Sequence, residues 1–154
     1  MGVKDNLTFT PIKNKKMTTI TIINGPNMNL LGKRQKNIYG TKSLKTIIHN
    51  LYHEFKNKAI IKHFQSNSEE QLIKKIHTTQ SKYIILNMAG FSYNNIAILD
   101  ALLAKNTKFL EVHMSNIFNR NKFRRKSIFS KYAMGVLIGL GDKVYKTAVY
   151  YLTS

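Results

Sequence analysis

The chain has 154 residues and is 43% hydrophobic, enough to bury the core of one ordinary domain without cross-links. It contains no cysteine, which excludes disulfides, a thiol nucleophile and cysteine-ligated metal centres. Lys and Arg number 25 against seven Asp and Glu, so the formal net charge is +18. The lysines are spread over every segment, which favours a solvated basic surface over a nucleic-acid partner.

Residues 1–17 are polar and lysine-rich, without the apolar run of a secretory signal, and we expect a disordered extension or one added for expression. No later apolar run approaches the roughly 20 residues that cross a bilayer, so no membrane partner is expected. Residues 18–154 are expected to form a single catalytic domain.

From Thr18 onward, apolar runs alternate with segments of helical periodicity. Ser43 and the Ser68–Gln71 pair have the spacing of helix N-caps, the second resembling a capping box. In chain order we predict a strand at 18–23, a helix at 44–55, a strand at 59–64, a helix from 69, a strand at 83–86, a helix at 94–105, strands at 108–112 and 136–140, and a last helix ending at Tyr151.

This alternation predicts a flavodoxin-like α/β fold, a three-layer sandwich around a five-stranded parallel sheet of order 2-1-3-4-5. Strands one, three and four are then neighbours, and their carboxyl ends carry Asn27, Asn87 and His113. An Asn after a strand often only makes a turn. Convergence of both with His113 on one crevice favours a functional site instead.

Two motifs follow apolar runs, and a third segment lies between them. They are Asn24-Gly25-Pro26-Asn27-Met28-Asn29-Leu30-Leu31-Gly32, Arg34-Gln35-Lys36-Asn37-Ile38-Tyr39-Gly40 and Glu111-Val112-His113-Met114-Ser115-Asn116. With them the chain closely resembles type II 3-dehydroquinate dehydratase from about Thr18 to the C-terminus. The resemblance implies conversion of 3-dehydroquinate to 3-dehydroshikimate by anti elimination through an enolate, in the shikimate pathway. It also implies a cytoplasmic enzyme without cofactor or metal, assembled as trimers within a dodecamer.

Such a dehydration needs a base beside the ketone and an acid for the leaving hydroxyl. The resemblance makes Tyr39 the base, and because a free tyrosine titrates near pH 10 it needs a cation, for which Arg34 matches. His113 is the candidate acid. Glu111, two residues earlier on a strand, shares its face and is expected to orient the imidazole.

Further roles come from the resemblance alone. Asn27 positions the group that faces the enolate oxygen, while Asn87, Met114 and Ser115 hold the substrate carboxylate. Arg124 contacts a substrate hydroxyl, Arg120 is a second basic position near the lid, and Asp100 reaches the neighbouring subunit's site. Tyr93 stands where the family has a substrate-contacting histidine.

Two alternatives stay open at this stage. Besides an active dehydratase, one alternative is a weakened homologue that binds a related hydroxy acid, and the other is a basic nucleic-acid-binding module on the same fold. His49 and His53 are four residues apart on a predicted helix, but no third ligand is apparent, and we expect no metal there.

Overall fold

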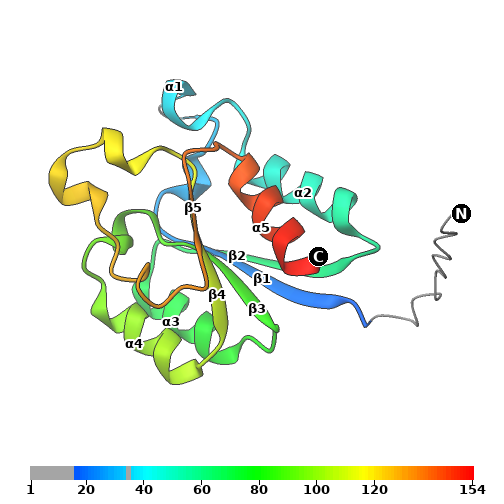
Figure 1. Cartoon of the computed structure of the whole chain (residues 1–154). Coiled ribbons are helices and arrows are strands. Elements are labelled where there is room, and N and C mark those ends of the chain that lie inside the picture. The colour runs from blue at the N-terminus through cyan, green and yellow to red at the C-terminus, as the bar shows by residue number, and fades with distance from the viewer. Residues whose placement is uncertain (1–15, 34–35) are drawn as a thin grey trace, which may run out of the picture.

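The computed structural model describes residues 16–33 and 36–154, and its centre is a parallel sheet of five strands (Figure 1). The strands lie in the order β2-β1-β3-β4-β5, as the sequence predicts. Most of the extension expected at residues 1–17 lies outside the described residues. In chain order the strands are β1 Thr18–Asn24, β2 Ala59–Gln65, β3 Tyr83–Asn87, β4 Lys108–His113 and β5 Val136–Ile138.

Helices cover both faces of the sheet and complete three layers. Helices α2 and α5 lie on one face, and α3 and α4 lie on the other (Figure 1). Within the described ranges, no helix is long and apolar enough to span a membrane. The helices are α1 Lys36–Tyr39, α2 Leu44–Phe55, α3 Glu69–Thr78, α4 Ile96–Lys105 and α5 Lys143–Thr153.

The strands at the centre are buried on both faces, because successive side chains point to opposite sides. In β1, Ile20 and Ile22 join the core under α2 and α5, while Ile23 joins the core over α3 and α4. Each of these side chains is wholly buried, and each such burial is worth about 1.5–3 kcal/mol. The core therefore fixes where the central strands end, and with them the polar residues at their carboxyl ends.

Both predicted N-caps are present. Ser43 Oγ accepts a hydrogen bond from Thr46 N at 3.1 Å, and Ser68 Oγ accepts one from Gln71 N at 3.3 Å. The capping box at Ser68 is only half formed, because the Gln71 side chain accepts a hydrogen bond from Ser66 instead of reaching back. Each cap satisfies one backbone N–H that the first helical turn leaves unpaired.

Candidate active site

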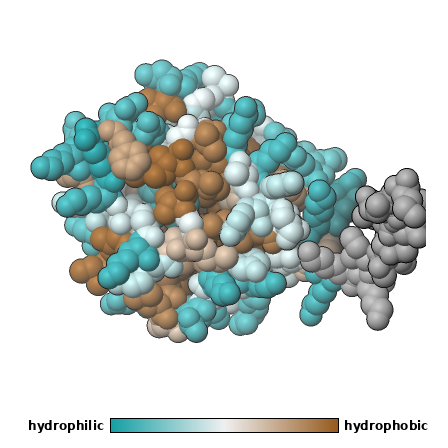
Figure 2. Space-filling model, viewed as in Figure 1, coloured by the Kyte–Doolittle hydropathy of each residue, from teal (hydrophilic) through white to brown (hydrophobic). Residues whose placement is uncertain are grey.

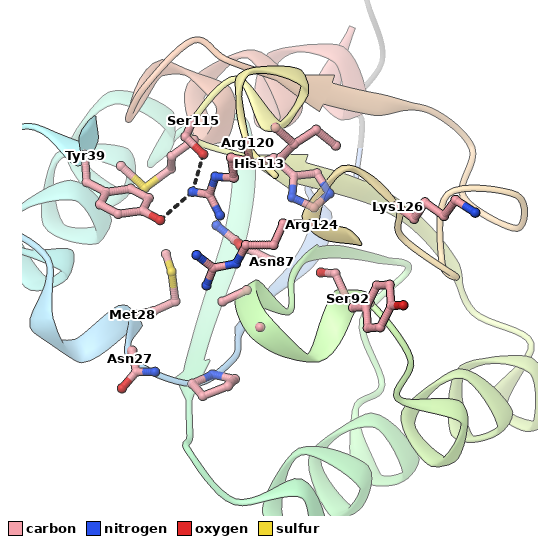
Figure 3. Close-up of a pocket in the computed structure, with 16 residues that line it drawn as sticks. Asn27, Met28, Tyr39, Asn87, Ser92, His113, Ser115, Arg120, Arg124 and Lys126 are labelled. Carbon is pink, nitrogen blue, oxygen red and sulfur yellow. Dashed lines mark hydrogen bonds between the residues drawn. The ribbon is translucent and has the colours of Figure 1, made fainter. Parts of the chain in front are cut away.

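A cavity of about 260 Å³ opens at the carboxyl ends of the central strands, where the winding of the sheet changes direction (Figure 3). Asn27 after β1, Asn87 at the end of β3 and His113 at the end of β4 all line it. Residues far apart in the sequence thus meet at one place, as the strand order predicts.

The loop after β1 lies directly against the turn after β3. Gly25 donates its N–H to the carbonyl of Asn87 at 2.8 Å. A Cβ at Gly25 would stand 2.5 Å from the carbonyl oxygen of Met88, a distance that only glycine avoids. This close approach packs the loop that carries Asn27 against the turn that follows Asn87.

The imidazole of His113 is held from behind by a buried carboxylate. His113 Nε2 lies 2.8 Å from Glu111 Oε1, and Glu111 is 1% exposed. Ser127 and Ser130, in the segment before β5, donate hydrogen bonds to Oε1 and Oε2 of Glu111. The carboxylate therefore has donors on both oxygens.

Burial of Glu111 acts to raise its pKa, but the hydrogen bond and charge of His113 and the hydrogen bonds from Ser127 and Ser130 outweigh it. The pKa of the Glu111 carboxyl is therefore held below its ordinary value. Glu111 is an anion at neutral pH, and the fold keeps that anion against the inner edge of the imidazole.

Tyr39 is the last residue of α1, and its hydroxyl points into the cavity (Figure 3). Arg120 Nη2 donates to Tyr39 Oη at 2.5 Å and to Ser115 Oγ at 2.5 Å. The guanidinium carbon lies 5.6 Å from the centre of the phenol ring. Arg34, the cation expected beside Tyr39, lies outside the described residues, so Arg120 is the arginine that the described structure places on this hydroxyl.

The cavity lining is strongly positive. Arg120, Arg124 and Lys126 contribute cations, and no Asp or Glu is among the described residues that line it. Glu111 lies behind His113 and does not reach the opening. An anionic ligand matches this lining.

The turn after β3 supplies a free polar group. Ser92 Oγ is buried at the cavity with no hydrogen-bond partner among the described residues. Burying a hydroxyl without a partner costs free energy, which a bound polar ligand recovers. Next to it, Tyr93 is 44% exposed and meets the edge of Phe123 with ring centres 6.3 Å apart.

Most of the predicted site residues meet in this cavity. Asp100 does not: it lies on the exposed side of α4 and is not part of the lining. The predicted residues that do line it are Asn27, Tyr39, Asn87, Tyr93, His113, Met114, Ser115, Arg120 and Arg124.

Sequence reasoning missed the groups that support these side chains. Ser127 and Ser130 follow no strand end and match no motif, and only the fold brings them to Glu111. Ser92 also lines the cavity without having been singled out. Lys126 lines it too, and it was expected as part of a basic cluster that suits a carboxylate substrate, made of Arg120, Lys122, Arg124, Arg125 and Lys126.

No group of three or more His, Asp or Glu side chains suited to a metal ion occurs in the described parts of the chain. The rings of His49 and His53 lie 5.3 Å apart on α2. Two imidazoles alone do not complete a zinc site.

The structure is that of an α/β protein with a doubly wound parallel sheet, in which a tyrosine and a carboxylate-bonded histidine line a basic cavity at the switch point. Residues 18–153 match the family model described as dehydroquinase class II. The chain belongs to this family.

Related sequences and solved structures agree with this family assignment. The 3-dehydroquinate dehydratase of Francisella philomiragia subsp. philomiragia is 45% identical over 133 residues, covering 84% of this chain and 90% of that protein. The enzyme of the same name from Francisella tularensis subsp. novicida is 47% identical over 131 residues, with coverage of 84% and 90%.

Two crystal structures of type II dehydroquinases, from Propionibacterium acnes and Butyrivibrio crossotus, superpose with TM-scores of 0.84 and 0.85. Each is 34% identical, and each comparison covers 90% of this chain and 99% of the other. None of these similarities supports the nucleic-acid-binding or weakened-homologue alternatives.

Proposed function

We propose that this chain dehydrates 3-dehydroquinate to 3-dehydroshikimate, in the shikimate pathway of aromatic amino-acid biosynthesis. One observation carries the proposal: the Tyr39 phenol and the Glu111-backed imidazole of His113 line one small, cation-rich cavity. The relatives named 3-dehydroquinate dehydratase support the same reaction. The step is redox-neutral, and protein side chains carry out both proton transfers.

Tyr39 is the proposed base that removes the proton beside the ketone. A phenol does this at neutral pH only if its anion is favoured, and Arg120 donates directly to the Tyr39 oxygen. Arg34, five residues before Tyr39 in the sequence, is proposed as a second cation. Loss of the proton leaves an enolate, whose oxygen faces the group positioned by Asn27.

His113 is the proposed acid that protonates the departing hydroxyl. Glu111 holds the ring by one nitrogen, which leaves the other for proton delivery, and its charge stabilises the positive imidazolium. When the C–O bond breaks, the electron pair leaves with the hydroxyl, and the proton from His113 completes water. The enolate electrons form the new carbon–carbon double bond and restore the ketone.

The substrate carboxylate is proposed to lie against Asn87, Ser115 and the backbone near Met114, where a short turn follows β4. Arg124 and Tyr93 are proposed to contact substrate hydroxyls. Ser92 joins them as the unpaired hydroxyl of the same wall.

Residues 18–154 are proposed to form one catalytic domain, located in the cytoplasm, in a homo-oligomer of trimers within a dodecamer. Apolar side chains along β5 are only half-buried and form part of the apolar surface seen in Figure 2. On α4, Ile96 and Leu103 are exposed on the helix that carries Asp100. These surfaces suit subunit contacts, and Asp100 is proposed to reach a neighbour's site.

The test is an ultraviolet assay for the conjugated product after 3-dehydroquinate is added. We expect product with normal saturation, and none from the corresponding compound with a hydroxyl in place of the ketone, because it cannot form an enolate. Retention on duplex DNA that falls steeply with salt, without turnover, would favour a nucleic-acid function instead. Binding of 3-dehydroquinate without turnover would identify a weakened homologue.

A further inference from the structure

A buried chain of hydrogen bonds leads away from the active site through the core. Asn87 Nδ2 donates to Tyr145 Oη at 2.8 Å, and Tyr145 Oη donates to Asn24 Oδ1 at 2.5 Å. Asn24 Nδ2 then lies 3.1 Å from His63 Nε2. Asn24 and Tyr145 are wholly buried, so the middle of this chain is shielded from water, whereas His63 is only partly buried.

The two ends of the chain open on different cavities. Asn87 lines the active site, whereas His63 lines a separate cavity between α2 and β2. The link between them comes from α5, whose Tyr145 points back under the carboxyl ends of β1 and β3. None of the proposed catalytic steps uses Tyr145, Asn24 or His63.

All the hydrogen bonds of this chain follow one donor-to-acceptor pattern, because the number of donors and acceptors on each hydroxyl and amide group is fixed. The single proton of Tyr145 goes to Asn24, so Tyr145 can only accept from Asn87. The amide nitrogen of Asn87 is thereby held toward Tyr145. Nδ2 carries two hydrogens, so the second N–H of Asn87 stays available, in a fixed orientation, to donate to a ligand carboxylate.

The protonation state of His63 determines the direction of these hydrogen bonds at the end away from the active site. Asn24 Nδ2 is a donor, so His63 Nε2 accepts and carries no proton. Burial lowers the pKa of His63 below its ordinary value of 6.5, which favours the neutral ring at pH 7. In the cavity between α2 and β2 that His63 lines, the other described titratable groups come from α2. They are Lys45, His49 and Tyr52.

We propose that Tyr145, Asn24 and His63 are positioning residues of the active site, which act through Asn87 to hold its amide so that the second N–H of Nδ2 donates to the substrate carboxylate. This inference rests on the proposed dehydratase function. A proton on His63 places two donors face to face, so Asn24 turns its oxygen to His63. Tyr145 then accepts from Asn24 and donates to Asn87, and the Asn87 amide turns over.

The first experiment compares Tyr145→Phe with the wild type in the product assay. Without the Tyr145 hydroxyl, the Asn87 amide no longer holds its hydrogen bond to the substrate carboxylate in place. We expect KM of Tyr145→Phe to rise about tenfold or more, while kcat stays within about twofold. In an Asn87→Ala background the same change leaves KM unaltered, because the residue through which Tyr145 acts is gone. Equal effects in both backgrounds, or an unchanged KM, would overturn the proposal.

A second variant keeps the proposal testable if Tyr145→Phe does not fold. We expect the wild-type KM to rise as the pH falls from 6.5 through the lowered pKa of His63, and this rise should disappear in His63→Gln, which retains an acceptor but does not titrate. His49→Gln is the matched control, since it removes an imidazole from the same cavity but not from the chain. An acid-side rise that persists in His63→Gln would overturn the linkage.

A readout without substrate separates this proposal from the dehydratase function. The side-chain amide resonances of Asn87 are observed in protein labelled with ¹⁵N-asparagine and identified by their loss in Asn87→Ala. They should move in Tyr145→Phe and during the titration of His63, and remain constant over the same pH range in His63→Gln. Unmoved resonances overturn the positioning role, whereas absent turnover with moving resonances overturns only the dehydratase function.

Discussion

Glu111 is the single residue whose surroundings say most about the site. Its carboxylate is buried at the end of β4 and receives hydrogen bonds from His113, Ser127 and Ser130. An isolated buried charge is costly, and these donors offset that cost. The same bonds that stabilise the anion also fix the imidazole beside the substrate cavity.

Replacing Glu111 with Gln tests both roles. The carboxamide keeps the size but loses the charge, and its NH₂ group faces donors that need an acceptor. We expect the free energy of unfolding to fall by about 1–3 kcal/mol and kcat to fall at least about tenfold. Chemical denaturation and the product assay measure the two effects. An unchanged kcat would remove Glu111 from the proposed mechanism.

The lowered pKa of Glu111 predicts an acid-dependent stability. The folded state favours the Glu111 anion. Its contribution to the free energy of unfolding is therefore complete above the ordinary pKa of 4.5 and is lost as the pH falls through the lower pKa of the folded state. The difference in unfolding free energy between wild type and Glu111→Gln should therefore shrink below pH 4.5. Denaturation curves at pH 6, 4 and 3 measure it, and a constant difference would contradict the assignment.

By the resemblance, Tyr93 stands where the family has a substrate-contacting histidine. Tyr93→His restores a shorter side chain with two nitrogens for hydrogen bonding, and we expect kcat/KM to rise about threefold or more. Tyr93→Phe, which lacks the hydroxyl, should lower it. Steady-state kinetics compare the three proteins, and a substrate contact at this position is refuted if neither change alters kcat/KM.

Individual residues also show where sequence reasoning stops. Glu111 and His113 could be paired in advance, because alternate residues of a strand share a face. Ser127 and Ser130 could not be paired with Glu111, since they reach it across 16 and 19 residues of irregular chain. Tyr145 was expected to make core or subunit contacts, and its hydrogen bond with Asn24, 121 residues away in the sequence, depends on how α5 packs on the sheet.

Among the elements, the sequence predicted the bounds of those with a regular apolar pattern well, and it predicted the short elements β5 and α1 poorly. Apolar runs and Ser caps placed α2 and β1 to β4 to within two residues, because burial and capping are local signals. β5 ends at Ile138, before the predicted Leu140, since Gly139 has a φ of +84° that breaks the ladder. The four-residue helix α1 has no apolar period, so the helical turn that carries Tyr39 was expected only as loop.

The contact between the loop after β1 and the turn after β3 is tested by Gly25→Ala. The new Cβ meets the Met88 carbonyl oxygen at 2.5 Å and pushes the two segments apart. We expect about 2 kcal/mol or more of destabilisation, together with a raised KM because Asn87 moves. Gly90→Ala, where a Cβ meets nothing within 4 Å, should change stability by less than about 0.5 kcal/mol. Equal stability of the two variants would contradict the close packing.

For the molecule as a whole, the net charge of +18 and the basic lining of the cavity act in the same direction. Both attract an anionic substrate, and salt screens that attraction. We expect kcat/KM to fall roughly threefold to tenfold between 0.01 and 0.2 M salt, with the change in KM and not in kcat. Kinetics at constant pH measure this, and a salt-independent KM would show that the surface charge has no part in substrate capture.

The central claim is that the Tyr39 phenol takes the proton beside the ketone, and Tyr39→Phe tests it most directly. The change removes one oxygen from a half-buried side chain and leaves the fold intact. We predict that the rate of conjugated-product formation at saturating 3-dehydroquinate falls by about 10²- to 10⁴-fold, while Tyr151→Phe on the exposed side of α5 stays at the wild-type rate. Turnover by Tyr39→Phe within about twofold of the wild type would contradict the account.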